Sequence, residues 1–167
     1  MLRLAERIDR LSTLVGRLAA WLVLVAVLVQ FAVVVLRYVF GMGSIRLQES
    51  VVYAHAFAFL LAAAWTLKAD AHVRVDIFYR AASARRRALV DLFGTVFLLL
   101  PMAGLILWVS LPYVLRSWAI FEGSQETAGL PFVFVLKTAI PLFAALLILQ
   151  GAAELARALA VLRAPAR

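Results

Sequence analysis

Two histidines and two nearby aspartates are the residues whose types could carry chemistry in this chain. Asp70, His72 and Asp76 fall within seven residues, a spacing that could hold a metal ion or relay a proton. The same residues also fit a loop on a membrane surface, with Asp76 capping a short helix that leads into the next apolar segment. His55 is seventeen residues from His72, about 25 Å along a helix, so the two histidines cannot share a metal. We expect no metal site.

The motifs of common catalytic and nucleotide-binding sites are absent from the sequence. There is no G-x-x-x-x-G-K-[ST] loop for ATP phosphates, no H-E-x-x-H zinc motif and no G-x-S-x-G nucleophile elbow. The chain has no cysteine, which excludes disulfides, thiolate metal sites, iron–sulfur clusters and cysteine nucleophiles. We therefore expect neither an enzyme nor a protein that binds a cofactor.

The elements that must position these residues are long apolar segments. Apolar residues make up 66% of the 167 residues and the mean hydropathy is +1.00, whereas a soluble domain is about 45–50% apolar. A helix of about 20 apolar residues crosses the hydrocarbon layer of a membrane. The sequence predicts an all-α integral membrane protein, a single membrane domain over residues 1–167 with four transmembrane helices at about 18–36, 50–67, 92–115 and 135–153. Pro101 and Pro112 are expected to kink the third of these.

Basic residues are concentrated on one side of these four spans. If the chain crosses four times, thirteen Lys and Arg fall in the two terminal segments and in the connection between the second and third spans, against four on the other side. Because cytoplasmic segments collect Lys and Arg, this predicts that the N- and C-termini are both cytoplasmic. The net charge of +8 is then explained by the orientation of the chain in the membrane, and it gives no support for a nucleic-acid partner.

The first 17 residues carry a helical pattern of their own. Leu4, Ile8, Leu11 and Val15 share one face, and basic residues lie opposite. We expect residues 1–17 to form an amphipathic helix on the inner membrane surface, although a soluble N-terminal extension of the first helix fits the same pattern. The apolar run that follows has nineteen residues, longer than the core of a signal peptide, about 7–15 residues. The first span is therefore expected to stay as an anchor.

Few polar residues lie within the predicted spans. Gln30 and His55 are six or seven residues from the nearest charged residue, which places both about 10 Å below the same surface of an antiparallel hairpin. We expect them to hydrogen-bond across the first two spans, with a proton site at His55 as the alternative. The second span also carries small residues at four-residue spacing that favour close helix packing: Ala54, Ala58 and Ala62.

Three stretches resemble the sequence motifs of one known family. Gln48-Glu49-Ser50 opens the second span, His72-Val73-Arg74-Val75-Asp76 follows it, and Glu126-Thr127-Ala128-Gly129-Leu130-Pro131 precedes Lys137 at the fourth span. The middle stretch looks like the H-[IV]-x-[VM]-D pattern of the small membrane subunit, the DctQ type, of tripartite ATP-independent periplasmic (TRAP) transporters. The resemblance covers about residues 15–155.

This resemblance implies a non-catalytic subunit of a sodium-driven, binding-protein-dependent transporter for organic acids (carboxylates) in the bacterial inner membrane. The subunit would brace a large membrane subunit of the DctM type, which carries the substrate and sodium sites, while a periplasmic solute-binding protein delivers the substrate. The charged and polar residues at the membrane edges are then expected to hold the subunit interface or lipid headgroups: Arg46, Glu49, His72, Asp76, Glu126 and Lys137.

Two other interpretations fit the sequence. One is the small subunit of another carboxylate uptake system, the tripartite tricarboxylate type, which the stretch from His72 to Asp76 disfavours. The other is an independent four-helix membrane protein. It would act as an assembly factor for another complex, or as a small channel or enzyme in which His55 or the group of Asp70, His72 and Asp76 carries the chemistry.

Overall fold

The computed structural model of the protein describes residues 2–72, 79 and 82–164. Its elements are α1 (Leu2–Val39), α2 (Ile45–Lys68), α3 (Ala84–Gly94), the π-helical segment η1 (Thr95–Leu99), α4 (Leu100–Ala119) and α5 (Val133–Arg163). Because α3, η1 and α4 follow one another without a break, four helices are long and apolar enough to cross a membrane. No strand occurs within the described residues. The predicted all-helical fold with four spans is confirmed.

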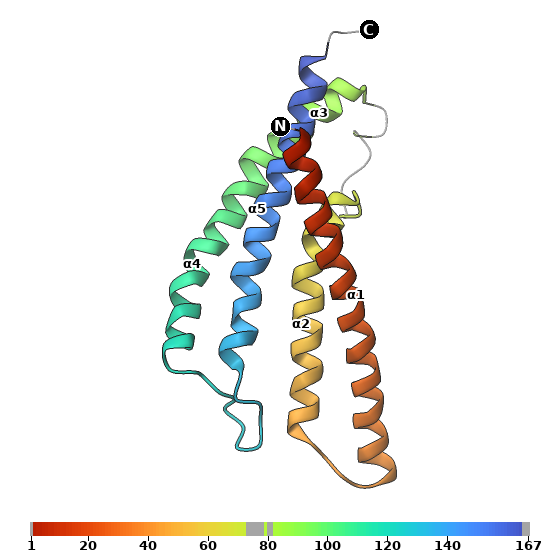
Figure 1. Ribbon diagram of the computed structural model, residues 1–167, viewed down its shortest axis with the longest axis vertical. Helices are drawn as coiled ribbons and strands as arrows, with labels where there is room; N and C mark the ends of the chain where they lie inside the picture. Colours follow the sequence, from red (N-terminus) through yellow and green to blue (C-terminus); the bar gives the residue numbers. More distant parts are fainter. Residues whose placement is uncertain (1, 73–78, 80–81, 165–167) are drawn as a thin grey trace.

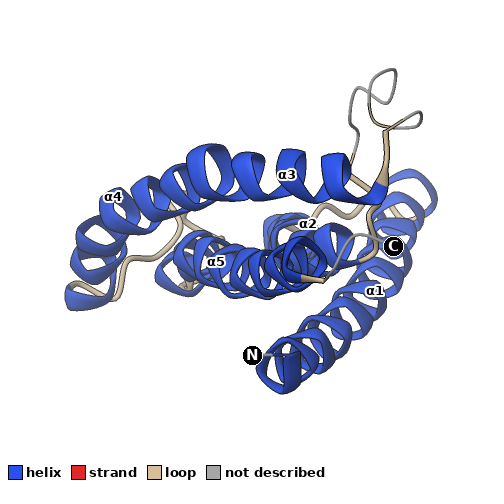
Figure 2. Cartoon of the chain, turned by 90° about the horizontal axis from the view of Figure 1, so that it is seen from above, coloured by secondary structure: helices blue, strands red, loops and turns tan. Residues whose placement is uncertain are grey.

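Two helical hairpins make up the bundle, and both turn at the same end (Figure 1). We call this the hairpin end, formed by the connections 40–44 and 120–132; the chain termini lie at the opposite, terminal end (Figure 1). Viewed along the bundle, α5 runs between α4 and the pair of α1 and α2 (Figure 2). It contacts α1, α2, α3 and α4, whereas the contacts of α4 among the described residues include neither α1 nor α2. α5 is therefore the element that joins the two hairpins.

The course of α1 corrects the expectation of a separate interfacial helix over residues 1–17. α1 is one helix of 38 residues, about 57 Å long, with no break where the amphipathic segment meets the apolar run. Ile8, from the face that was expected to lie on lipid, packs on protein instead and forms a buried cluster with Ala5 and with Ala153 of α5. Gly16 lies against Trp65 of α2, since a Cβ at this position would be 2.6 Å from the indole. These contacts keep the N-terminal turns in line with the span.

The third span contains a π-helical turn directly before Pro101. In this turn the N–H of Leu100 donates to the carbonyl of Thr95, five residues back. Proline lacks an N–H, and its ring would clash with the carbonyl four residues before it, so the wider turn accommodates Pro101 within a continuous helix. The helix leading into this span begins at Ala84, where Ser83 caps the first turn. The expected helix start at about residue 76 falls outside the described residues, as does Asp76 itself.

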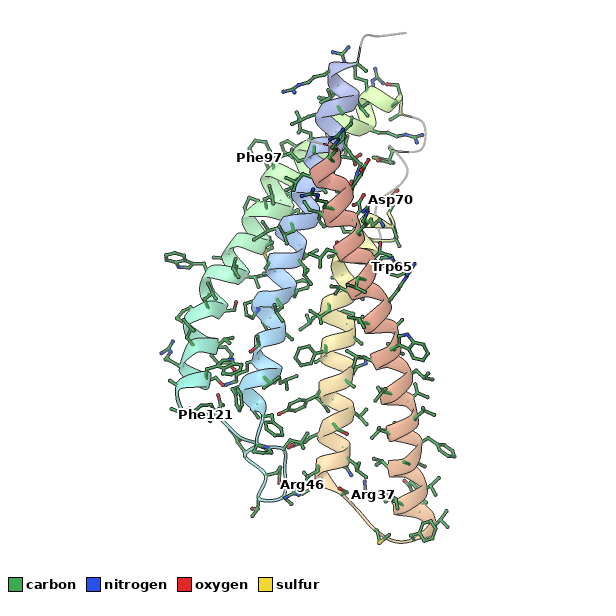
Figure 3. The ribbon with its side chains drawn as sticks, viewed as in Figure 1. Arg37, Arg46, Trp65, Asp70, Phe97 and Phe121 are labelled. Carbon is green, nitrogen blue, oxygen red and sulfur yellow. The ribbon has the colours of Figure 1, made fainter. Side chains whose placement is uncertain are left out.

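The helices pack through small residues, while many large apolar side chains point outward (Figure 3). Among the described residues, nine alanines are at most 5% exposed: Ala5, Ala19, Ala58, Ala64, Ala88, Ala103, Ala139, Ala144 and Ala153. By contrast, Phe31, Phe59 and Trp108 are 67%, 74% and 80% exposed. An apolar surface of this extent is not stable in water, so lipid or partner helices must cover it.

Candidate functional site

At the hairpin end, Glu49 of α2 holds the connection between α4 and α5. Its Oε1 accepts a hydrogen bond from Ser124 Oγ, and its Oε2 accepts one from the N–H of Leu130, both at 2.5 Å. Gly129 lies in the same turn, and a Cβ there would be 2.3 Å from Ser124 Oγ and 2.8 Å from Glu49 Oε1. A side chain at residue 129 would displace the Ser124 hydroxyl and the Glu49 carboxylate, which explains why glycine stands here within the stretch Glu126–Pro131.

A second carboxylate ties α4 to α5 at this end. Glu122 Oε2 accepts hydrogen bonds from Lys137 Nζ at 2.5 Å and from Ser117 Oγ at 2.7 Å. The Lys137 ammonium also lies 4.2 Å from the centre of the Tyr113 ring, a cation–π contact. The hydrogen bond from Lys137, followed by the one from Ser117, lowers the pKa of Glu122 from its ordinary value of 4.5. This carboxylate is therefore charged at neutral pH. We call Glu49, Glu122, Ser124 and Lys137 the hairpin-end cluster.

The residues expected at a subunit or lipid interface do not form one site. Four of the six lie at the hairpin end: Arg46, Glu49, Glu126 and Lys137. Within this group Glu49 and Lys137 bond to other parts of the same chain, whereas the side chains of Arg46 and Glu126 are exposed, Arg46 at the start of α2 (Figure 3). His72 is exposed after the end of α2, towards the other end of the bundle. Asp76 is outside the described residues.

At the terminal end, a polar cluster that the sequence analysis did not predict joins α1 to α5. Gln150 is completely buried; its Oε1 accepts a hydrogen bond from Ser12 Oγ at 2.7 Å. Its Nε2 donates to Asp9 Oδ1 and to Glu154 Oε1, both at 3.1 Å. Arg157 bridges the same two carboxylates, with Nη1 at 2.9 Å from Asp9 Oδ2 and Nη2 at 2.5 Å from Glu154 Oε1. These five residues are the terminal-end cluster.

α2 reaches the terminal-end cluster through its last residue, Lys68. The Lys68 Nζ donates to Thr13 Oγ1 at 2.6 Å and to the backbone carbonyl of Asp9 at 3.3 Å. A signal for this cluster is present in the sequence as helical spacing. The polar residues recur at three- and four-residue intervals on one face of each helix: Asp9, Ser12 and Thr13 on α1, and Gln150, Glu154 and Arg157 on α5. The spacing marks a polar face on each helix but does not show that the two faces meet.

Gln30 of α1 and His55 of α2 meet at one groove, but they are not hydrogen-bonded to each other as we expected. Both side chains are exposed. The His55 ring lies parallel to the ring of Phe59, one turn further along α2, with the centroids 6.4 Å apart, which directs the imidazole along its own helix and not across to α1. The groove is lined by Val23, Ala26, Val27, Gln30, Val51 and His55.

The predicted packing ridge of α2 is buried at its centre. Ala58 is buried, while Ala54 and Ala62, one turn to either side, are half-buried. α2 contacts both α1 and α5, so small residues on this helix serve two neighbours.

Together these features define an all-helical, membrane-spanning protein whose charged side chains tie its own helices together. In the part of the chain that the structure describes, no group of three His, Asp or Glu side chains could hold a metal ion. The family model for the DctQ component of the tripartite ATP-independent periplasmic transporters matches residues 26–161, so the chain belongs to this family of small TRAP transporter subunits. No match was found among curated proteins or among solved structures.

Proposed function

We propose that this subunit has no catalytic or substrate-binding role of its own and braces the large membrane subunit of a sodium-driven transporter for organic acids. The observation that carries the proposal is the family match over residues 26–161. The tripartite composition of the family supports two partners, a large membrane subunit of the DctM type and a periplasmic solute-binding protein.

The distribution of charge supports a bracing role. A path for an ion or an organic acid normally needs ionisable groups or interrupted helices within the membrane. In this sequence the stretches 50–67, 92–115 and 138–153 contain no Asp, Glu, Lys or Arg. At the ends of the bundle, Lys137 pairs with Glu122, and Arg157 pairs with Asp9 and Glu154. Charges paired in this way fix helices to one another and are poorly suited to binding and releasing a substrate.

The distribution of Lys and Arg along the chain supports an orientation in the bacterial inner membrane with both termini in the cytoplasm. The terminal segments and the connection after α2 carry thirteen Lys and Arg, against four towards the hairpin end. The hairpin end would then face the periplasm, where Arg46 and Glu126 are exposed to a partner or to lipid headgroups. Glu49 and Lys137 would shape the connection that presents them, and His72 and Asp76 would lie at the cytoplasmic headgroups.

Purification with native partners tests the proposal. The chain is tagged at its C-terminus, extracted from native membranes in mild detergent, and its co-eluting proteins are identified by mass spectrometry. We expect a large, many-span membrane protein in equal amount. Proteoliposomes holding both subunits and supplied with the binding protein should accumulate labelled organic acid when an inward sodium gradient is imposed. Recovery of the chain alone, or equal uptake by the large subunit without it, would contradict the proposal.

A further inference from the structure

The groove between α1 and α2 exposes two polar side chains where the surroundings are hydrocarbon. Gln30 and His55 are six or seven residues, about 10 Å, inside the nearest charged residue of their helices. Both are exposed, and they are not hydrogen-bonded to each other. An amide or imidazole N–H in hydrocarbon costs free energy unless another protein group bonds to it. An occupant of the groove that hydrogen-bonds to Gln30 and His55 would therefore lower the free energy of these two side chains.

The shape of the groove suits a helix. Its floor includes the buried Ala26, and its remaining lining consists of three valines, so no bulky side chain fills it: Val23, Val27 and Val51. Ala26, a small residue, allows the backbone of another transmembrane helix to approach closely at this point, and the polar side chains beside it then hydrogen-bond across the contact.

The outward face of α4 provides a contrast. Met102, Leu105 and Val109 are exposed there, and all three are apolar. Lipid acyl chains can cover such a face without loss. Acyl chains cannot bond to Gln30 or His55, so the chemistry of the groove selects a protein partner over lipid.

We propose that a transmembrane helix of the large membrane subunit packs into this groove and places a hydrogen-bonding side chain opposite Gln30 and His55. This inference rests on the proposed function and adds the face of the small subunit that the partner uses.

Photocrosslinking from one position in the groove tests the contact. Val27 lines the groove and Val25 does not, yet both are exposed valines on α1, at 58% and 48%, and they lie at nearly the same depth. Each is replaced in turn by a benzophenone amino acid, and the tagged subunit is irradiated in native membranes. We expect a crosslink from position 27 to the large subunit and at most a trace from position 25.

The other outcomes separate the failure of this inference from the failure of the proposed function. If the large subunit co-purifies but crosslinks to position 25 and not 27, the face is wrong. A crosslink from position 27 to a second copy of this chain, or to lipid alone, also overturns the inference while leaving the proposed function intact. If no large subunit co-purifies with either variant or with the unmodified chain, the proposed function has failed and the inference with it.

Leucine substitutions test the hydrogen bonds. Gln30→Leu and His55→Leu should each weaken recovery of the large subunit by about threefold, the effect of one typical hydrogen bond between membrane helices. The thermal stability of the isolated subunit should stay the same or rise, because a lipid-exposed polar group is lost. Thr66→Val is the control, since the Thr66 hydroxyl bonds to the Ala62 carbonyl of its own helix. A loss of stability in the isolated subunit, with no change in complex recovery, would show that the two residues serve the fold and not a partner.

Discussion

Replacing Gln150 with leucine should weaken the attachment of α1 to α5, because this amide is the centre of the terminal-end cluster. The side chain is 0% exposed, and it bonds to Ser12 and Asp9 of α1 and to Glu154 of α5. Leucine has a similar size, so the substitution removes hydrogen bonds without leaving a large cavity.

The loss can be worked out from these three bonds. A side-chain hydrogen bond between membrane helices contributes about 0.6 kcal/mol on average, so the two bonds that cross to α1 contribute about 1.2 kcal/mol. The third bond, to Glu154 four residues on in α5 itself, adds about 0.2–0.5 kcal/mol. Two of the bonds are to carboxylates, and the Ser12 hydroxyl, 2% exposed, would be left buried without its partner, which raises the loss to about 2–3 kcal/mol. For a chain of this length about 1 kcal/mol corresponds to a shift of 2–4 °C, so the melting temperature should fall by about 4–12 °C.

Thermal melting of the purified subunit in detergent, followed by circular dichroism, measures this effect. Gln30→Leu is the matched control: it is the same substitution within a span, but at an exposed side chain. We expect the control to change the free energy of unfolding by less than about 0.5 kcal/mol. Equal losses for the two variants, or no loss for Gln150→Leu, would refute the assignment of Gln150 as the centre of the contact between α1 and α5.

Three further predictions concern other contacts. The lysine partner of Glu122 holds the pKa of this carboxyl below its ordinary 4.5, so the pair stabilises the fold above about pH 4.5 and loses its effect as the pH falls through the lowered pKa. The melting temperatures of wild type and Glu122→Gln should therefore differ at pH 7 and converge in acid. A difference that persists in acid would contradict this. Gly16→Ala should destabilise the chain by about 1–3 kcal/mol, because the new Cβ would lie 2.6 Å from Trp65. Gly104→Ala in α4, where a Cβ would have nothing within 4 Å, should stabilise the chain by about 0.5–1 kcal/mol. A higher melting temperature for Gly16→Ala than for Gly104→Ala would disprove the packing of Gly16 against Trp65. Glu49→Gln should speed proteolysis within 120–132, because an amide cannot accept both bonds that the carboxylate accepts, and an unchanged cleavage rate would count against this role of Glu49.

The existence of four spans could be predicted from the sequence, but the ends of the helices could not. Runs without charge mark the part of a helix that lies in hydrocarbon, and the runs 92–115 and 138–153 led to the predicted spans at about 92–115 and 135–153. The observed helices extend over Ala84–Ala119 and Val133–Arg163. The difference arises because charged residues such as Lys137 and Arg157 continue the helix and bond to partners on neighbouring elements. A charge ends an apolar run without ending a helix.

The clusters at the two ends were harder to predict because their members are far apart in the sequence. Glu49 was selected through its motif, but its partner Ser124 is 75 residues away and becomes a neighbour when the two hairpins lie side by side. Ser12 and Gln150 are separated by 138 residues. The spacing along one helix shows that it has a polar face, and the identity of the facing helix follows from the packing of small residues such as Ala153.

The two clusters place the charged contacts of α5 at opposite sides of an apolar middle. Lys137 and Arg157 are twenty residues apart on this helix, about 30 Å, which is the thickness of the hydrocarbon layer. Because α5 contacts all four of the other helices, fixing both of its ends fixes the bundle. The charges of Lys137, Glu154 and Arg157 are then engaged in holding the fold. Gln30 and His55, by contrast, present hydrogen-bonding groups outward from the apolar middle of the hairpin of α1 and α2. This arrangement suits the proposed role, in which the subunit would recognise a partner helix within the membrane without itself binding the transported molecule.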